Sequence, residues 1–206
     1  MSSSMIRWCG WAAAVGGAMW AAKGLAILVT GSQPPLLFEV PLLLFPVGLL
    51  GLHARLRGQT GRLLAAGGVV SAIALVAGAA AVVMLTIDPD ADGVVPGVAI
   101  AGSALGTVAG LVLLGLVARR AEIFRPPWHR LPLLIGLSIP ILLTVVGGAL
   151  AAIDERLLEV PLVLVAAAWV RLGVLIAAVD RAGGSNGEPT SSRRGTPSPW
   201  FSRPGK

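Results

Sequence analysis

The chain has 206 residues, of which 55% are hydrophobic and 13% are charged, and its formal net charge is +6. Because soluble domains carry roughly 25% charged residues and need polar surface to cover their cores, this composition excludes an ordinary soluble domain. The positive charges lie at the ends of apolar runs and near the C-terminus, without a basic face that carries interleaved aromatic residues, which argues against nucleic acid as a partner.

Six apolar runs follow one another along the chain, and most reach the roughly 20 residues that a helix needs to cross about 30 Å of hydrocarbon. An open sheet would leave unpaired backbone groups in lipid, and the alternating pattern of a transmembrane barrel is absent from the sequence. We therefore expect an all-α fold, a polytopic membrane protein with a bundle of six transmembrane helices. The runs occupy residues 8–30, 36–53, 63–87, 94–118, 131–153 and 157–179.

The first two runs differ from a plain transmembrane segment. The first exceeds the roughly 7–15 apolar residues of a secretory signal peptide and contains Lys23, so we expect it to be retained as a helix. The second run is the shortest and contains Pro41 and Pro46. Cys9, in the first run, is the only cysteine of the chain, which excludes an internal disulfide.

The connections between the runs alternate in charge, and this alternation predicts the orientation. Lys and Arg near helix ends collect on the cytoplasmic side of a membrane. The opposite connections are uncharged or mainly acidic, with Asp88, Asp154 and Glu155 among their residues. Both termini are therefore predicted to be cytoplasmic, and the Ala-, Gly-, Val-, Leu- and Arg-rich composition is typical of a bacterial inner-membrane protein. The basic connections contribute the cytoplasmic determinants Arg55, Arg57, Arg62, Arg119, Arg120, Arg125 and Arg130.

The chain divides into two parts by composition. Residues 1–182 contain all six apolar runs and form the predicted transmembrane domain. Residues 183–206 are rich in Gly, Ser, Pro, Thr and Arg, a composition that cannot bury a core, so we expect a disordered, basic cytoplasmic tail. Membrane lipid is an expected partner of this tail, because cations near an anionic surface attract its headgroups.

The second, fourth and sixth runs share a Val-Pro dipeptide near their start. Proline is tolerated in the first turn of a helix, where its missing N–H would have had no partner. The shared position predicts three helical hairpins that run in the same direction. An internal repeat and a chance match among few residue types both explain the likeness. The three segments are Glu39-Val40-Pro41, Val94-Val95-Pro96 and Glu159-Val160-Pro161.

The fourth run carries glycines four residues apart, at Gly102, Gly106 and Gly110. Such a spacing makes a flat ridge on a helix, and a second helix can approach its backbone closely. We expect this candidate packing ridge to meet another helix of the same bundle, and a dimer interface is the alternative.

Charged residues also fall inside the apolar runs, where an unpaired charge costs about 2.5–3.5 kcal/mol. Lys23 and Glu39 lie at similar depths in the outer half of the predicted membrane, so a Lys23–Glu39 pair across the first hairpin is expected. Glu159 occupies the matching depth in the sixth run. These three residues form a candidate intramembrane polar site, which either binds a proton, cation or polar headgroup or joins helices as a structural staple. Arg171, nearer the inner end, is expected to extend to the headgroups.

Motifs for chemistry are missing from the sequence. It contains no phosphate-binding glycine loop, zinc-protease helix or nucleophile elbow, and both histidines, His53 and His129, lie at predicted helix ends. We therefore predict no catalytic residue, no metal ligand and no cofactor. The first functional hypothesis is a non-enzymatic membrane component that assembles as a homo-oligomer or with a membrane-protein partner. The alternatives are a small transporter or channel that uses the Lys/Glu site, and a membrane-embedded enzyme or cofactor carrier.

Overall fold

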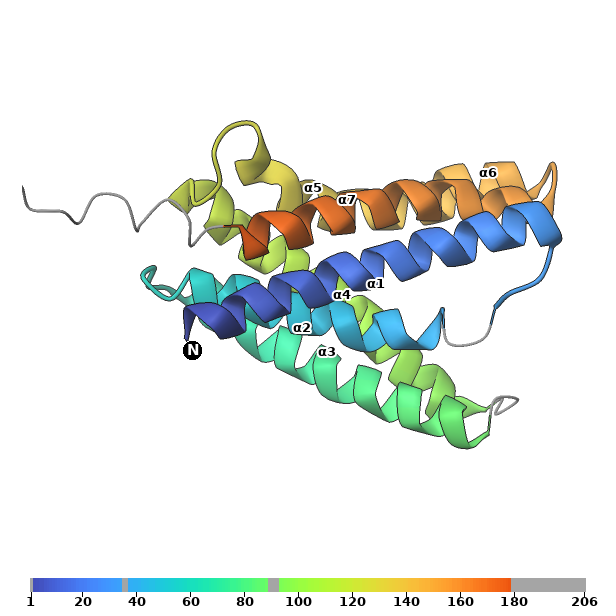
Figure 1. The fold of residues 1–206 in the computed structure, drawn as a ribbon, viewed down its shortest axis with the longest axis horizontal. Coiled ribbons are helices and arrows are strands. Elements are labelled where there is room, and N and C mark those ends of the chain that lie inside the picture. Colours follow the sequence, from blue (N-terminus) through green and yellow to red (C-terminus); the bar gives the residue numbers. More distant parts are fainter. Residues whose placement is uncertain (1, 35–36, 89–92, 179–206) are drawn as a thin grey trace, which may run out of the picture.

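A computed structural model describes residues 2–34, 37–88 and 93–178 as an all-α bundle (Figure 1). A π-helical turn at Leu142–Gly147 joins α5 to α6, so these two helices act as one helical segment. Short 3₁₀ turns, Trp128–Arg130 and Glu155–Leu158, precede α5 and α7. The predicted tail at 183–206 lies outside the described residues. The helices are α1 (Ser3–Thr30), α2 (Glu39–Arg55), α3 (Arg62–Ile87), α4 (Val94–Ala121), α5 (Leu131–Ile141), α6 (Gly148–Ala151) and α7 (Glu159–Ala177).

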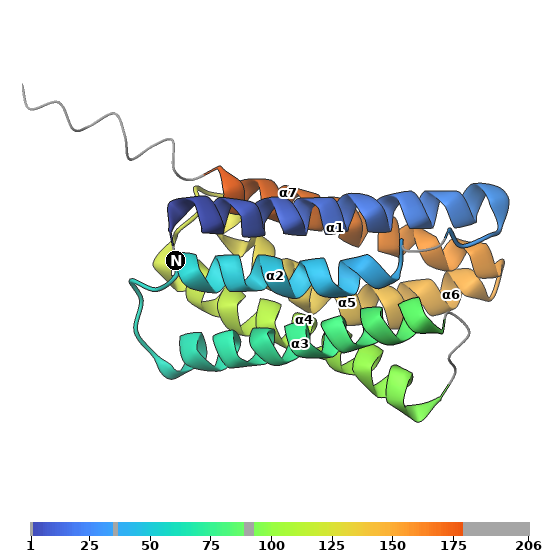
Figure 2. The same ribbon diagram turned by 60° about the horizontal axis from the view of Figure 1, so that its bottom comes forward.

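The described part of the chain forms six helical segments that close into a ring. Each of α1, α2, α3, α4 and α5 packs on the next segment, and α7 returns to pack along α1, its most extensive contact. The shorter α2 also packs on α4 and α7, which gives it the most central position (Figure 2). The third predicted hairpin is looser than the other two, because α5 packs mainly on α4 while α7 packs mainly on α1.

Five of the described segments are long and apolar enough to cross a membrane, and α2 is the exception. Its 17 residues rise only about 26 Å. The predicted start of this helix, residue 36, is wrong by three residues, because α2 begins at Glu39. An earlier start would put Pro41 inside the helix, where the missing N–H and the ring disrupt the hydrogen-bond ladder. The same reason applies to α7, which begins at Glu159 and carries Pro161 in its first turn.

Many large apolar side chains face outward along the bundle. Val76 of α3, Leu105 of α4 and Leu164 of α7 are more than half exposed, and similar residues occur on every segment except α2. In water, an apolar surface of this extent would be a liability, whereas lipid tails cover it at no cost. Together with the five long apolar segments, this surface makes the chain a multi-pass membrane protein.

The two ends of the bundle differ in charge, and the figures show which connections share an end. The N-terminus, the α2–α3 connection and the α4–α5 connection lie together at one end (Figures 1 and 2). All seven arginines predicted as cytoplasmic determinants lie in or beside these connections, so we name this the arginine-rich end. The opposite end holds Asp88, Asp154 and Glu155, and we name it the acidic end.

Glycines seven residues apart on α1 determine how α7 packs. A Cβ atom added to Gly10 would lie 2.6 Å from the backbone nitrogen of Ala177, and one added to Gly17 would lie 2.7 Å from the carbonyl oxygen of Ala166. Real Cβ atoms essentially never approach other atoms so closely. Gly24 continues the row and faces Val163 and Glu159. The two helices therefore meet backbone to backbone, as small residues allow in membranes.

Candidate functional site

The candidate site is built around a buried ion pair between the first and last helices. Lys23 Nζ of α1 donates to both carboxylate oxygens of Glu159 of α7, at 3.1 and 3.4 Å. Each residue is only 7% exposed. The glycine row positions the pair, because Gly24 follows Lys23 directly and leaves room for the Glu159 side chain beside the α1 backbone.

The structure pairs Lys23 with Glu159 and leaves Glu39 out of that pair. The described residues contain a single ion pair within 4.0 Å, Lys23–Glu159, so the expected Lys23–Glu39 pair across the first hairpin is not formed. On the side of α2, Lys23 Nζ instead lies over the ring of Phe38, the residue that precedes this helix, at 5.5 Å from the ring centroid. An ammonium group over an aromatic face is weakly stabilised by the quadrupole of the ring.

Glu39 lies at the start of α2 in an unusual environment. Its Oε2 atom is buried and accepts no hydrogen bond from the described residues. A buried carboxylate oxygen without a partner is costly, since desolvation is not repaid by a hydrogen bond. With all three groups ionised, Lys23, Glu39 and Glu159 would carry a net charge of −1. One further positive charge, on a proton or a cation, would balance the three residues.

A second polar contact joins three helices around a proline in α2. Pro46 has no N–H, so it cannot bond to the carbonyl of Leu42, four residues earlier. The hydroxyl of Ser103 on α4 donates to that carbonyl oxygen at 2.8 Å. Gly78 of α3 completes the arrangement, because any side chain there would collide with the same oxygen. Ser103 was not predicted as a site residue from the sequence, although Pro46 is a signal that the Leu42 carbonyl lacks its usual backbone donor.

The glycine ridge of α4 faces α3. A Cβ added to Gly106 would lie 2.8 Å from Cβ of Ala74, and one added to Gly110 would lie 2.8 Å from the hydroxyl oxygen of Ser71. Gly102 is less crowded, with Ala77 Cβ at 3.4 Å. Close packing of α4 on α3 therefore occupies this ridge within the chain.

Arg55 and Arg171 each place their guanidinium over an aromatic ring, and Arg55 also donates a hydrogen bond to the end of a helix. Arg55, at the end of α2, donates to the carbonyl oxygen of Leu175 at 2.8 Å, and its guanidinium lies 4.8 Å from the centre of the Phe124 ring. It thereby satisfies a carbonyl in the last turn of α7, where a cation is also favoured by the helix dipole. Arg171 is exposed, and its guanidinium lies 4.3 Å from the centre of the Trp128 ring at the arginine-rich end.

Two of the pockets formed by the described residues differ in character. One, of about 80 Å³, lies in the core, and its lining includes Trp20, Phe45 and Trp169. Phe45 stacks on Trp169 with ring centroids 4.4 Å apart and meets Trp20 edge-on at 5.1 Å. This cavity is almost entirely apolar.

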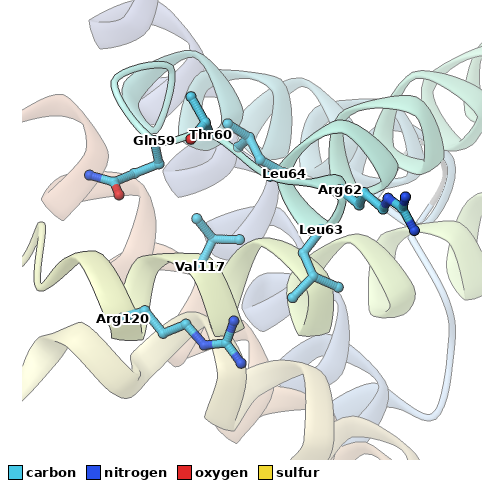
Figure 3. Close-up of a pocket in the computed structure, with 8 residues that line it drawn as sticks. Gln59, Thr60, Arg62, Leu63, Leu64, Val117 and Arg120 are labelled. Atoms are coloured by element: carbon cyan, nitrogen blue, oxygen red, sulfur yellow. The ribbon is translucent and has the colours of Figure 1, made fainter.

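The second cavity, of about 210 Å³, lies at the arginine-rich end and has a partly polar lining. Gln59 and Thr60 come from the α2–α3 connection, Arg62 from the first turn of α3, and Val117 and Arg120 from α4 (Figure 3). Of the other predicted determinants, Arg57, Arg119, Arg125 and Arg130 are exposed side chains at the same end of the bundle.

No group of three or more His, Cys, Asp or Glu residues that could hold a metal ion occurs in the described part of the chain. Comparison of the chain with protein-family models, with curated proteins and with solved structures found no match.

Proposed function

We propose that this multi-pass membrane protein is a non-enzymatic membrane component that crosses a bacterial inner membrane six times and assembles with a second copy or a membrane-protein partner. Both termini lie in the cytoplasm in this proposal. The non-enzymatic part rests on the sequence, which carries none of the spaced nucleophiles, bases or metal ligands that catalysis needs.

The exposed face of α1 is the observation that supports assembly. The other two faces of this helix are covered by α2 and α7. The exposed residues are spaced alternately three and four apart, which is the spacing of a seam between paired helices. Small residues in its middle would let a partner helix approach closely. The seam consists of Trp8, Trp11, Val15, Ala18, Ala22, Leu25 and Val29.

Native mass spectrometry of the full chain in detergent tests this assembly. We expect an oligomer of the wild-type protein, and we expect Ala18→Trp to shift it toward monomer by filling the seam. Val76→Trp, on the exposed face of α3, is the matched control and should leave the oligomer unchanged. A wild-type protein that stays monomeric and carries no partner subunit at every concentration would contradict the proposal. An absorption spectrum of the same sample would reveal any bound chromophore and so tests the non-enzymatic part.

Glu39 favours a second candidate function, a small transporter or channel for a proton, a cation or a small polar or lipid solute. The supporting observation is the buried Glu39 Oε2, which has no hydrogen-bond partner among the described residues, while Lys23 is paired with Glu159. Buried carboxylates of this kind mark ion pathways in membrane proteins. In proteoliposomes with a pH-sensitive dye inside, Glu39→Gln should abolish any proton flux of the wild-type protein. Equal flux through both proteins, or none through the wild type, removes proton transport from the candidates.

A further inference from the structure

We propose that the outer side of α3 binds one anionic phospholipid, with its phosphate at the arginine-rich end and an acyl chain along the helix. This inference does not depend on the oligomeric state or on transport. It rests on the cavity beside Arg62 and Arg120 and on the hollows that adjoin it.

The cavity at the arginine-rich end has the donors that a phosphate needs. Arg62 and Arg120 extend from different helices, with Leu63 between them in the view of Figure 3. Neither guanidinium forms an ion pair with an acidic residue of the described chain. Thr60 adds a hydroxyl and Gln59 an amide. Guanidinium groups bind phosphate oxygens in two-point hydrogen bonds, so an unpaired set on two helices suits a phosphate monoanion.

The start of α3 adds to the attraction for an anion. Gly61 precedes the helix and supplies no side chain to cap its first backbone N–H groups. These groups carry the positive end of the helix dipole, and α3 is 26 residues long. The volume of about 210 Å³ leaves room for a phosphate with part of its glycerol linker.

Two hollows continue from this cavity along α3, of which the first is partly polar, with His53 in its lining, and the second is apolar. The first, of about 500 Å³, shares Gly61 and Leu64 with the arginine cavity. The second, of about 490 Å³, shares Val69 and Ala72 with the first, and its lining exposes no polar surface. It ends near Ala80, so the three hollows follow α3 for about 28 Å from Gly61 at the helical rise. An acyl chain of one leaflet spans about half of the roughly 30 Å hydrocarbon core, so it would occupy the part of the hollows nearest the arginine cavity.

This combination favours a phospholipid over other occupants. A free phosphate would use the arginine cavity and leave the hollows empty. A helix of a second copy would cover the hollows but would bring no negative charge to the arginines. The acidic residues near this end of the described chain amount to Glu122, against seven exposed arginines at positions 7, 57, 62, 119, 120, 125 and 130. Only an amphipathic anion matches both the charge at one end and the apolar surface that follows it.

Lipid binding to the full chain, measured by native mass spectrometry, tests the proposal. The probes are dioleoylphosphatidylglycerol and dioleoylphosphatidylcholine, which share their acyl chains, and glycerol phosphate, which has none. We expect the wild-type protein to retain one phosphatidylglycerol in preference to phosphatidylcholine. Each cation near an anionic group contributes about five-fold to the affinity. The double variant Arg62→Gln with Arg120→Gln should therefore weaken phosphatidylglycerol binding about 25-fold. Arg57→Gln with Arg125→Gln, which removes the same charge outside the cavity, should change it less than two-fold.

The second part of the experiment tests the acyl-chain site with two substitutions on α3. Ala72→Phe fills the hollows and should weaken both lipids, whereas Ala66→Phe, exposed but outside all three hollows, should weaken neither. Equal losses in the two arginine double variants would overturn the proposal. So would displacement of the lipid by equimolar glycerol phosphate, or a lipid-free dimer that Ala72→Phe dissociates. Should the Arg62/Arg120 variant fail to fold, Arg120→Gln alone, checked by its elution profile and helicity, gives the same comparison.

Discussion

Glu39 and Glu159 show how one local sequence can reach two environments. Each is the first residue of its helix and is followed by Val and Pro. Glu159 bonds Lys23, whereas the buried Oε2 of Glu39 has no hydrogen-bond partner among the described residues. The difference comes from α1, because its glycine row brings α7, and not α2, against the backbone beside Lys23.

The same substitution at these two positions therefore has different expected effects. Glu159→Gln leaves Lys23 buried without a counter-charge, and we expect a loss of about 2.5–3.5 kcal/mol in the free energy of unfolding. Glu39→Gln breaks no hydrogen bond of its Oε2 atom, and we expect a change of less than about 1 kcal/mol. Unfolding of both variants by sodium dodecyl sulfate in mixed micelles measures the difference. Equal losses would mean that the pair does not stabilise the bundle.

Ser103 allows a second prediction at the scale of single residues. Ser103→Ala leaves the Leu42 carbonyl without a donor, and we expect it to cost about 1 kcal/mol, within the range measured for side-chain hydrogen bonds in membranes. In a Pro46→Ala background the restored backbone N–H bonds that carbonyl, so the same change should cost close to nothing.

The control for this cycle is Ser71→Ala, because Ser71 donates to Gly67 within its own helix and that carbonyl already has a backbone donor available. Unfolding free energies of the four members of the cycle give the coupling. An identical cost of Ser103→Ala in both backgrounds would disprove the role assigned to Pro46.

The depth of each charged residue could be predicted from the sequence, whereas its partner could not. Helical rise and the loop charges give Lys23, Glu39 and Glu159 a common level. Which helix faces Lys23 depends on how α1 is rotated, and its apolar residues occur on every side. The glycines at positions 10, 17 and 24 contain that information, but their spacing becomes meaningful only when the partner helix is known.

At the scale of helices, the contact between α1 and α7 depends on the absence of side chains. Gly17→Ala would place a Cβ against backbone atoms of Ala166 and Val170, which cannot move as a side-chain tip can. We expect the helices to separate locally, with a loss of about 1–3 kcal/mol. Gly97→Ala on α4 is the control, since nothing lies within 4 Å of its added Cβ, and helix propensity alone would favour it. Thermal unfolding in detergent compares the two, and a Gly17→Ala protein as stable as Gly97→Ala would rule out backbone contact.

Of the three helices that begin with a Val-Pro dipeptide, the starts of α4 and α7 were predicted to within two residues, whereas that of α2 was not. The start of α4 at Val94 agrees with the expected run, and α7 begins two residues after the expected 157. The helix expected at 131–153 contains Pro140, which is followed by the π-helical turn. A hydropathy profile cannot reveal such a turn, because all residues of the turn except Thr144 and Gly147 are aliphatic.

At the scale of the whole molecule, the short helix α2 packs on four of the other five segments. Because α2 is enclosed by α1, α3, α4 and α7, its ends need not reach both surfaces of the bilayer as the outer segments do. Composition predicts a membrane protein, but it does not distinguish an enclosed short helix from the longer segments that pack on it. The proposed orientation depends on α2 crossing, since one missing passage would move every later connection to the opposite side.

Cysteine labelling in intact cells tests that crossing directly. In a Cys9→Ser background, Ser32→Cys precedes α2 and Gly58→Cys follows it, and both positions are exposed. With a membrane-impermeant maleimide, we predict that Ser32→Cys reacts from outside the cell and that Gly58→Cys reacts only after the membrane is opened. Reaction of both cysteines from the same side, or of Gly58→Cys alone from outside, would contradict the six-crossing bundle with cytoplasmic termini.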